Sequence, residues 1–167
     1  MKSRNQPVHT TAADESHLRA AFAAARAHAI AGGLPFAARL VDIQGTVCFE
    51  AVNEVARTGD PTAHAEIMLL RQAASAVPQV AFPRMTLYAA VEPCAMCAAA
   101  IIWSGIGRVV YGVGASRVRS SDPLPSGLVE PGITGRALLD ATPDGPEVVG
   151  PALEDEGEAA LFATTEG

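Results

Sequence analysis

The feature that most constrains this chain is the segment 92–97, which reads Glu-Pro-Cys-Ala-Met-Cys. Pro93 is favoured in the first turn of a helix and excluded from its interior, and the apolar run at 98–103 predicts a buried helix. Cys94 and Cys97 are therefore expected about one turn apart on one face of a helix N-terminus. The positive end of the helix dipole favours thiolates there, and two thiolates at this spacing make half of a tetrahedral zinc site.

A candidate for the other half lies upstream in segment 60–66, which reads Asp-Pro-Thr-Ala-His-Ala-Glu. His64 is the candidate third ligand, and it leaves a fourth position open for water. Three protein ligands with an open position are typical of a catalytic rather than a structural zinc ion. Glu66 follows two residues later, so we expect it close to the metal but facing elsewhere. That placement fits a proton shuttle better than a ligand.

Each of these motifs has an ordinary interpretation when it stands alone. A single Cys-x-x-Cys can be a redox pair or a chance match, and a lone histidine beside a glutamate is usually structural or solvated. Here the two motifs occur together, each before a predicted helix. We therefore favour catalytic zinc, followed by structural zinc and then a redox pair.

Composition bounds the class of protein. At 167 residues the chain is expected to form one domain (1–167), with a core at about 14–113 and a divergent C-terminal segment at 114–167. Apolar residues make up 49% and charged residues 18%, which is ordinary for a globular protein. The net charge of -6 argues against a broad basic surface for nucleic acid. We interpret Arg117 and Arg119 as part of a solvated loop.

The remaining cysteine and the N-terminal region bear on the compartment. Cys48 lies in a strand-like run at 46–49 and is predicted to be an inert core thiol. Three cysteines in this pattern suit a reducing cytosol better than a disulfide scaffold. The first ten residues lack an apolar signal core, and arginines and a histidine interrupt the Ala-rich stretch 18–30, which argues against a membrane span. We expect a cytoplasmic protein.

Hydrophobic periodicity and turn residues predict the secondary structure. Helices are expected at 14–31, 63–76, 94–104 and 151–162, with a short helical piece at 134–139, and strands at 36–41, 46–52, 86–91, 107–112 and 147–149. Alternation of strands and helices predicts an α/β fold with a mixed, largely parallel sheet covered by helices. The candidate metal ligands then lie at helix starts outside strand ends, where open α/β sheets bind ligands.

Several segments resemble the cytidine deaminase superfamily. Residues 53–67 and 87–97 carry the resemblance, which is closest to the guanine deaminase and tRNA adenosine deaminase branch. Residues 100–106 and 32–38 are similar to bacterial guanine deaminases in particular. The resemblance is strong from about 15 to 113 and weak beyond.

The resemblance implies a fold and a set of site residues. The fold would be a three-layer α/β/α sandwich around a mixed five-stranded sheet, usually in dimers. Zinc would be held by His64, Cys94 and Cys97, with Glu66 as the proton carrier. Asn53 would hydrogen-bond the substrate base rather than only cap the loop after the second strand.

Further contacts to the substrate are expected from residues around the two motifs. Phe36 and the backbone near Ala65 are candidates, and Trp103 either floors the pocket or fills the core. A carboxylate that reads guanine is expected after residue 111, with Asp122 and Glu130 as candidates.

The function implied is zinc-dependent hydrolytic deamination of a free nucleobase, with guanine first. Alternatives are another small substrate such as cytosine, an aminated triazine or a nucleoside, or adenosine in tRNA, which the acidic charge disfavours. A non-catalytic zinc-binding module is disfavoured by Glu66. We expect a small-molecule substrate, no membrane partner and a homodimer.

Overall fold

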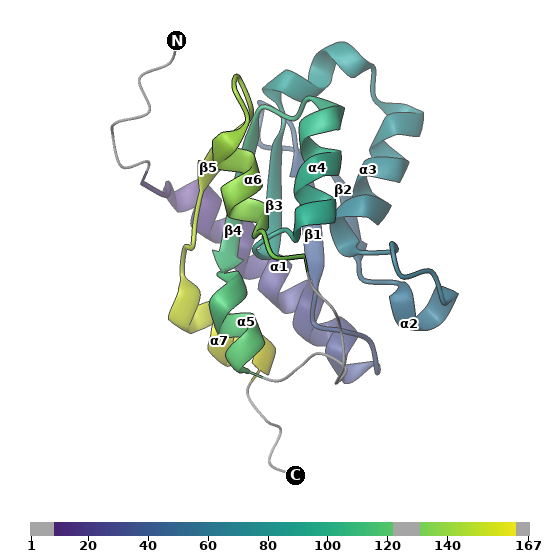
Figure 1. Cartoon of the computed structure of the whole chain (residues 1–167), viewed down its shortest axis with the longest axis vertical. Helices are drawn as coiled ribbons and strands as arrows, with labels where there is room; N and C mark the ends of the chain where they lie inside the picture. The colour runs from purple at the N-terminus through teal and green to yellow at the C-terminus, as the bar shows by residue number, and fades with distance from the viewer. Residues whose placement is uncertain (1–8, 122–130, 163–167) are drawn as a thin grey trace.

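A five-stranded sheet lies at the centre of the fold (Figure 1). The computed structural model describes residues 9–121 and 131–162. The strands are β1 (Ala37–Val41), β2 (Val47–Val52), β3 (Thr86–Val91), β4 (Arg108–Val113) and β5 (Glu147–Val149). Their order is β2-β1-β3-β4-β5, with β1 antiparallel to β2 and β3, and β4 parallel to β3 and β5. The predicted mixed sheet is confirmed, and parallel pairing is confined to β3, β4 and β5.

Helices cover both faces of the sheet. They are α1 (Ala12–Ile30), α2 (Val55–Thr58), α3 (Ala65–Ala76), α4 (Ala95–Ser104), α5 (Ala115–Ser120), α6 (Gly135–Ala141) and α7 (Glu154–Phe162), with a 3-10 turn η1 (Gln79–Arg84). Helices α3, α4 and α6 pack in one apolar cluster, and α1 and α7 pack in the other. The three-layer α/β/α arrangement expected from the resemblance is confirmed. No helix within the described ranges is long and apolar enough to cross a membrane.

Strand β3 shows how the sequence produces this layering. Leu87 and Ala89 pack in the cluster with α3 and α4, whereas Tyr88 and Ala90 pack in the cluster with α1. Because successive strand residues point to opposite faces and both faces are covered, the strand is buried from Leu87 to Val91.

The sheet topology brings four chain segments to one edge. Strand β2 is antiparallel to β1, which is antiparallel to β3, so β2 runs in the same direction as β3, β4 and β5. The segments that follow the carboxyl ends of these four strands begin at Asn53, Glu92, Gly114 and Gly150. Ligands bind at this edge in open α/β sheets, and the motifs identified in the sequence lie there.

Three local predictions are corrected. Helix α1 begins after Thr11 rather than at Asp14, because Thr11 and Asp14 exchange hydrogen bonds in a capping box (3.1 and 2.8 Å). Residues 115–120 form helix α5 where we expected a solvated loop. Cys48 is exposed rather than in the core, because it lies on the edge strand β2, where burial alternates and its side chain is on the more open face.

A buried ion pair joins α1 to the sheet. Asp14 is 1% exposed and receives two hydrogen bonds from the Arg108 guanidinium (2.6 and 3.0 Å) and one from the Tyr88 hydroxyl (2.8 Å). Burial by itself raises the pKa of Asp14. The hydrogen bonds from Arg108, the Thr11 backbone and Tyr88 outweigh it and hold the pKa of this carboxyl well below its usual range.

Replacing this carboxylate tests its contribution to stability. Asp14→Asn leaves Arg108 without its bidentate partner, and we expect the free energy of unfolding to fall by about 3–5 kcal/mol. Because the folded-state pKa is depressed, the stabilisation is present above about pH 4 and is lost as pH falls below it. Urea unfolding at several pH values measures both effects. An Asp14→Asn midpoint equal to that of the surface variant Glu156→Gln at pH 7 would contradict this account.

Candidate metal centre and pocket

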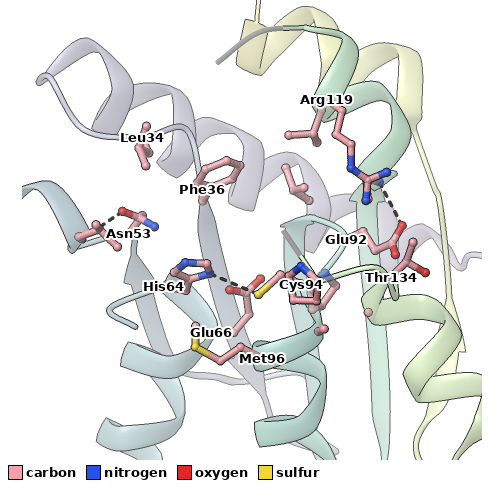
Figure 2. A pocket seen from close by; sticks show the side chains of 18 of the residues that line it. Leu34, Phe36, Asn53, His64, Glu66, Glu92, Cys94, Met96, Arg119 and Thr134 are labelled. Atoms are coloured by element: carbon pink, nitrogen blue, oxygen red, sulfur yellow. Dashed lines mark hydrogen bonds between the residues drawn. The ribbon is translucent and has the colours of Figure 1, made fainter. Parts of the chain in front are cut away.

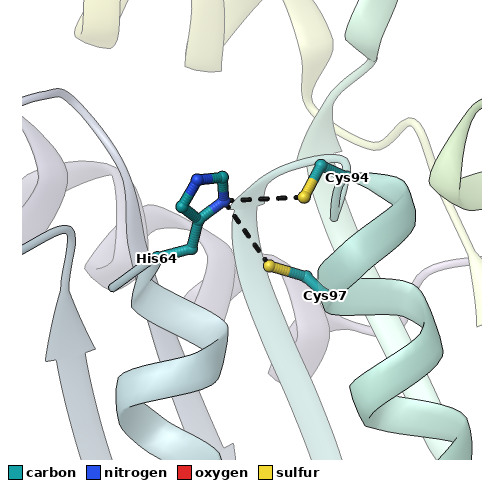
Figure 3. Close-up of side chains that lie close together, drawn as sticks. All are labelled: His64, Cys94 and Cys97. Atoms are coloured by element: carbon teal, nitrogen blue, oxygen red, sulfur yellow. Dashed lines mark hydrogen bonds between the residues drawn. The ribbon is translucent and has the colours of Figure 1, made fainter. Parts of the chain in front are cut away.

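Three candidate ligands come from the starts of two neighbouring helices. His64 is the N-cap of α3, Cys94 is the N-cap of α4, and Cys97 lies in the first turn of α4. Neither N-cap side chain caps its own helix in the described structure, so both are available to face each other. The Nδ1 atom of His64 lies 3.5 Å from the Cys94 sulfur and 3.6 Å from the Cys97 sulfur (Figure 3).

The donor set fits zinc. One imidazole nitrogen and two sulfurs lie within 4.8 Å of one another, as the sequence predicted. Zinc prefers nitrogen and sulfur donors in tetrahedral geometry, and three protein ligands leave one position for water or substrate. Cys97 is buried, whereas His64 and Cys94 are half-buried and line a cavity of about 410 Å³. The cavity therefore gives access to the open position.

The thiols already have the electrostatics of a cation site. Hydrogen bonds from the Cys97 thiol and then from the His64 ring lower the pKa of Cys94 to about 4. The hydrogen bond with Cys94 and burial raise the pKa of Cys97. Cysteine binds a metal ion as a thiolate, so a divalent ion held here would take Cys94 and Cys97 as two thiolate ligands.

Glu66 lies in the first turn of α3 and lines the same cavity. It is 8% exposed, and Figure 2 shows its carboxylate directed toward the space between His64 and Cys94. Burial raises the pKa of this carboxyl. A raised pKa brings proton exchange closer to neutral pH, which a proton shuttle requires.

Asn53 lines the cavity at the end of β2 and is 3% exposed. Its Oδ1 atom accepts a hydrogen bond from the Val55 backbone N–H at 3.1 Å, so it does cap the loop after β2. Figure 2 shows the amide nitrogen on the side that faces the cavity. Asn53 can therefore cap the loop with its oxygen and still direct its NH2 group toward a ligand in the cavity.

The other predicted contacts have mixed outcomes. Phe36 lines the cavity, whereas Ala65 is fully buried in the core cluster and is not among the described residues of the wall. Trp103 neither floors the pocket nor fills the core, because it is 87% exposed. Ile101, two residues earlier on α4, faces the core, which places Trp103 on the opposite side of the helix.

Asp122 and Glu130, the candidates for the carboxylate that reads guanine, lie outside the described residues. The prediction that one of them contacts the base stays a prediction.

Sequence reasoning missed much of the pocket wall. Most of the wall is apolar, and it includes side chains from α5 and from the segment before α6, namely Val118, Ile133 and Thr134. It also includes Glu92. Its position directly before Pro93 and Cys94 was the only sign in the sequence that it lies at the pocket. Val118 follows β4, and Ile133 and Thr134 precede α6, in the part of the chain beyond residue 113 where the resemblance to the family is weak.

Residues 11–113 match the family described as the cytidine and deoxycytidylate deaminase zinc-binding region. The chain belongs to this family. The matched residues include all three candidate zinc ligands and Glu66. For this deaminase family member, the metal centre therefore has two independent supports, the geometry of the donors and the family match.

Relatives of this deaminase family member differ in their substrates. The tRNA-specific adenosine deaminase of Haemophilus influenzae is 40% identical over 99 residues, which cover 59% of this chain and 57% of the relative. The probable cytosine deaminase of Schizosaccharomyces pombe is 34% identical over 143 residues, covering 86% of each chain. The structure of a guanine deaminase from Nitrosomonas europaea superposes with a TM-score of 0.71 at 25% identity, covering 94% of this chain and 86% of that one.

Removing one sulfur tests the ligand set. We expect the purified protein to bind about one zinc ion per chain, and Cys97→Ser to lose most of it because serine does not supply a thiolate. The matched control is Cys48→Ser, which changes the exposed cysteine of β2 and is expected to keep the full zinc content. Elemental analysis after gel filtration measures both. Full zinc content in Cys97→Ser would rule out this ligand set.

Proposed function

We propose that this chain is a zinc-dependent hydrolytic deaminase of a free nucleobase and that it converts guanine to xanthine and ammonia. The single observation that carries the proposal is the buried Glu66 carboxyl beside the His64, Cys94 and Cys97 donors, in the wall of a mainly apolar cavity. A structural zinc site is usually closed by four protein ligands and has no use for a neighbouring proton carrier.

The chain's own groups account for the remaining steps of hydrolysis. A zinc ion held by the three donors would lower the pKa of a bound water to about 7 and so supply hydroxide at neutral pH. Glu66 accepts the proton of the attacking water and delivers it to a ring nitrogen. It then takes the proton of the hydroxyl that the attack has placed on the ring carbon and delivers it to the amino group, so that the carbon–nitrogen bond breaks and ammonia leaves. The Asn53 amide orients the base by a hydrogen bond, and apolar residues such as Phe36 exclude water from the base.

A free base suits this cavity better than a nucleic acid. Binding of tRNA depends on phosphate contacts by basic residues, and a net charge of -6 disfavours them over most of the surface. Among the solved structures, the guanine deaminase covers 94% of this chain with a TM-score of 0.71, whereas a tRNA:A34 deaminase covers 81% with a TM-score of 0.61.

Cytosine is the second candidate substrate. The relative named a probable cytosine deaminase matches 86% of this chain. Cytosine is smaller than guanine, and a hydrogen bond from the Asn53 amide would orient either base in the cavity.

Ammonia release over a panel of substrates tests the proposed function. We expect turnover of guanine above that of cytosine, adenine and their nucleosides. We also expect little change in rate between low and physiological salt, since no phosphate contacts are made. Deamination of adenosine in a tRNA anticodon loop, with no activity on any free base or nucleoside, would contradict the proposal.

The proton shuttle has its own test. Glu66→Gln keeps the shape of the side chain but removes proton transfer, so we expect unchanged zinc content and a fall in kcat of about a hundred- to ten-thousandfold. Glu54→Gln is the matched control, because Glu54 follows Asn53 but does not line the cavity in the described structure. A near-normal rate for Glu66→Gln would show that another group carries the proton.

We also propose that the protein is a homodimer. Trp103 and Val80 are 87% and 84% exposed, on segments joined by a 2.6 Å hydrogen bond from Gln79 to the Ser104 carbonyl. Large apolar side chains, and aromatic ones in particular, are typical of interface centres.

Sedimentation equilibrium tests the dimer. We expect wild-type protein at twice the chain mass, and a dimer at least about tenfold weaker for Trp103→Ser, which removes an interface aromatic. The control Ile43→Ser changes an exposed residue of the β1–β2 turn and should leave the mass unchanged. A monomeric wild type, or equal dimerisation of Trp103→Ser, would contradict this proposal.

We further propose the cytoplasm as the compartment. The structure leaves Cys48, Cys94 and Cys97 as free thiols. A metal site that depends on reduced cysteines fits a reducing compartment.

A further inference from the structure

The carboxylate of Glu92 joins three segments that are far apart in the sequence. Glu92 follows β3 and directly precedes Pro93 and the first zinc-site cysteine. Its Oε2 atom accepts a hydrogen bond from the Ala115 backbone N–H at 3.1 Å, and its Oε1 atom accepts one from the Arg136 backbone N–H at 3.0 Å. Each oxygen thus binds the first turn of a different helix, α5 or α6.

The two helices that Glu92 holds carry two walls of the pocket. Helix α5 contributes Ala115 and Val118, and the start of α6 contributes Thr134 and Gly135. Figure 2 shows Glu92 between Arg119 of α5 and Thr134, with the Arg119 guanidinium directed toward it. The distance from these walls to the metal ligands is therefore set through this side chain.

Gly135 gives independent evidence that α6 is seated directly on the metal-binding loop. A Cβ atom at Gly135 would lie 1.7 Å from the Pro93 carbonyl oxygen and 3.1 Å from that of Cys94. Contacts this short are not possible, so only glycine allows the backbone of α6 to approach the loop so closely. Gly132, three residues earlier, has no such neighbour within 4 Å.

Other interactions fix the outer sides of the same helices. Arg117 of α5 pairs with Asp155 and Glu158 of α7 (2.6 Å each), and Arg136 donates to the Gly150 carbonyl at 2.8 Å. Glu92 makes hydrogen bonds to both helices on the pocket side. Its loss would release the walls toward the cavity without removing these outer contacts.

We propose that Glu92 is a positioning residue that holds both pocket walls at a fixed distance from the metal centre, so that it determines how tightly the substrate binds. Glu92 itself does not contact the reacting atoms or transfer a proton. The inference rests on the proposed function for the identity of the substrate, but the hydrogen bonds themselves are testable without it.

The first test replaces the carboxylate. Glutamine has one acceptor oxygen and one NH2 group, so Glu92→Gln can bind only one of the two backbone N–H groups. We expect amide hydrogen exchange at Ala115 or Arg136 to be at least about tenfold faster in Glu92→Gln, and at both in Glu92→Ala. We expect the KM for guanine to rise by at least about tenfold with kcat within about threefold and zinc content unchanged. Glu15→Gln, on the surface of α1, is the control.

The second test leaves Glu92 intact and moves the wall by steric exclusion. Gly135→Ala forces α6 away from Pro93, so we expect the same rise in KM and faster exchange at Arg136. Gly132→Ala is the matched control in the same segment and should behave as wild type. This pair keeps the inference testable if Glu92→Ala does not fold.

The outcomes separate this inference from the proposed function. If the wild type does not turn over guanine, the proposed substrate is wrong, and amide exchange in Glu92→Gln alone decides the positioning role. Wild-type exchange rates in that variant would overturn the inference. A loss of kcat with KM unchanged would also overturn it, because Glu92 would then act on the reacting base itself.

Discussion

The structure depends on the convergence of two helix N-termini at one edge of the sheet. Strands β2 and β3 run in the same direction, so the segments after them lead to the starts of α3 and α4 side by side. Each start leaves its N-cap side chain free, which brings an imidazole and two sulfurs within 4.8 Å. No single element contains this site. Its geometry follows from the strand order, because a different order would separate His64 from the two cysteines.

At the bottom of the cavity the site has the metal ligands and the Glu66 carboxyl, which are polar, whereas most of the cavity wall is apolar. Burial raises the pKa of Glu66, which lies in the wall of this cavity. Two of the walls come from α5 and the start of α6, and the Glu92 carboxylate connects them to the metal-binding loop. The ligands and the proton carrier therefore lie in the segment that matches the family, whereas much of the wall lies beyond it. The relatives reported above are all named deaminases and are named for different substrates.

Local patterns predicted most of the elements and the three donors, and the family resemblance predicted the three-layer arrangement. Apolar strand runs and turn residues gave the five strands and helices α1, α3, α4, α6 and α7 to within about three residues, whereas α2, η1 and α5 were not predicted. The Cys94–Cys97 spacing with His64 gave the three donors. The sequence did not predict that Trp103 is exposed. An apolar residue in a helical run gives the same sequence pattern whether its face of the helix is covered or open to solvent. The role of Glu92 was also missed. Its partners are backbone N–H groups, which leave no pattern in the sequence.

The central claim is that three protein ligands hold a zinc ion with one position open, and X-ray absorption at the zinc edge of the purified protein tests it directly. The account predicts two sulfur neighbours at about 2.3 Å, one imidazole nitrogen at about 2.0–2.1 Å and one further oxygen or nitrogen donor. A soluble purine analogue should alter only that fourth donor. A zinc ion bound by four cysteine or histidine side chains, or one with a single sulfur neighbour, would contradict the account.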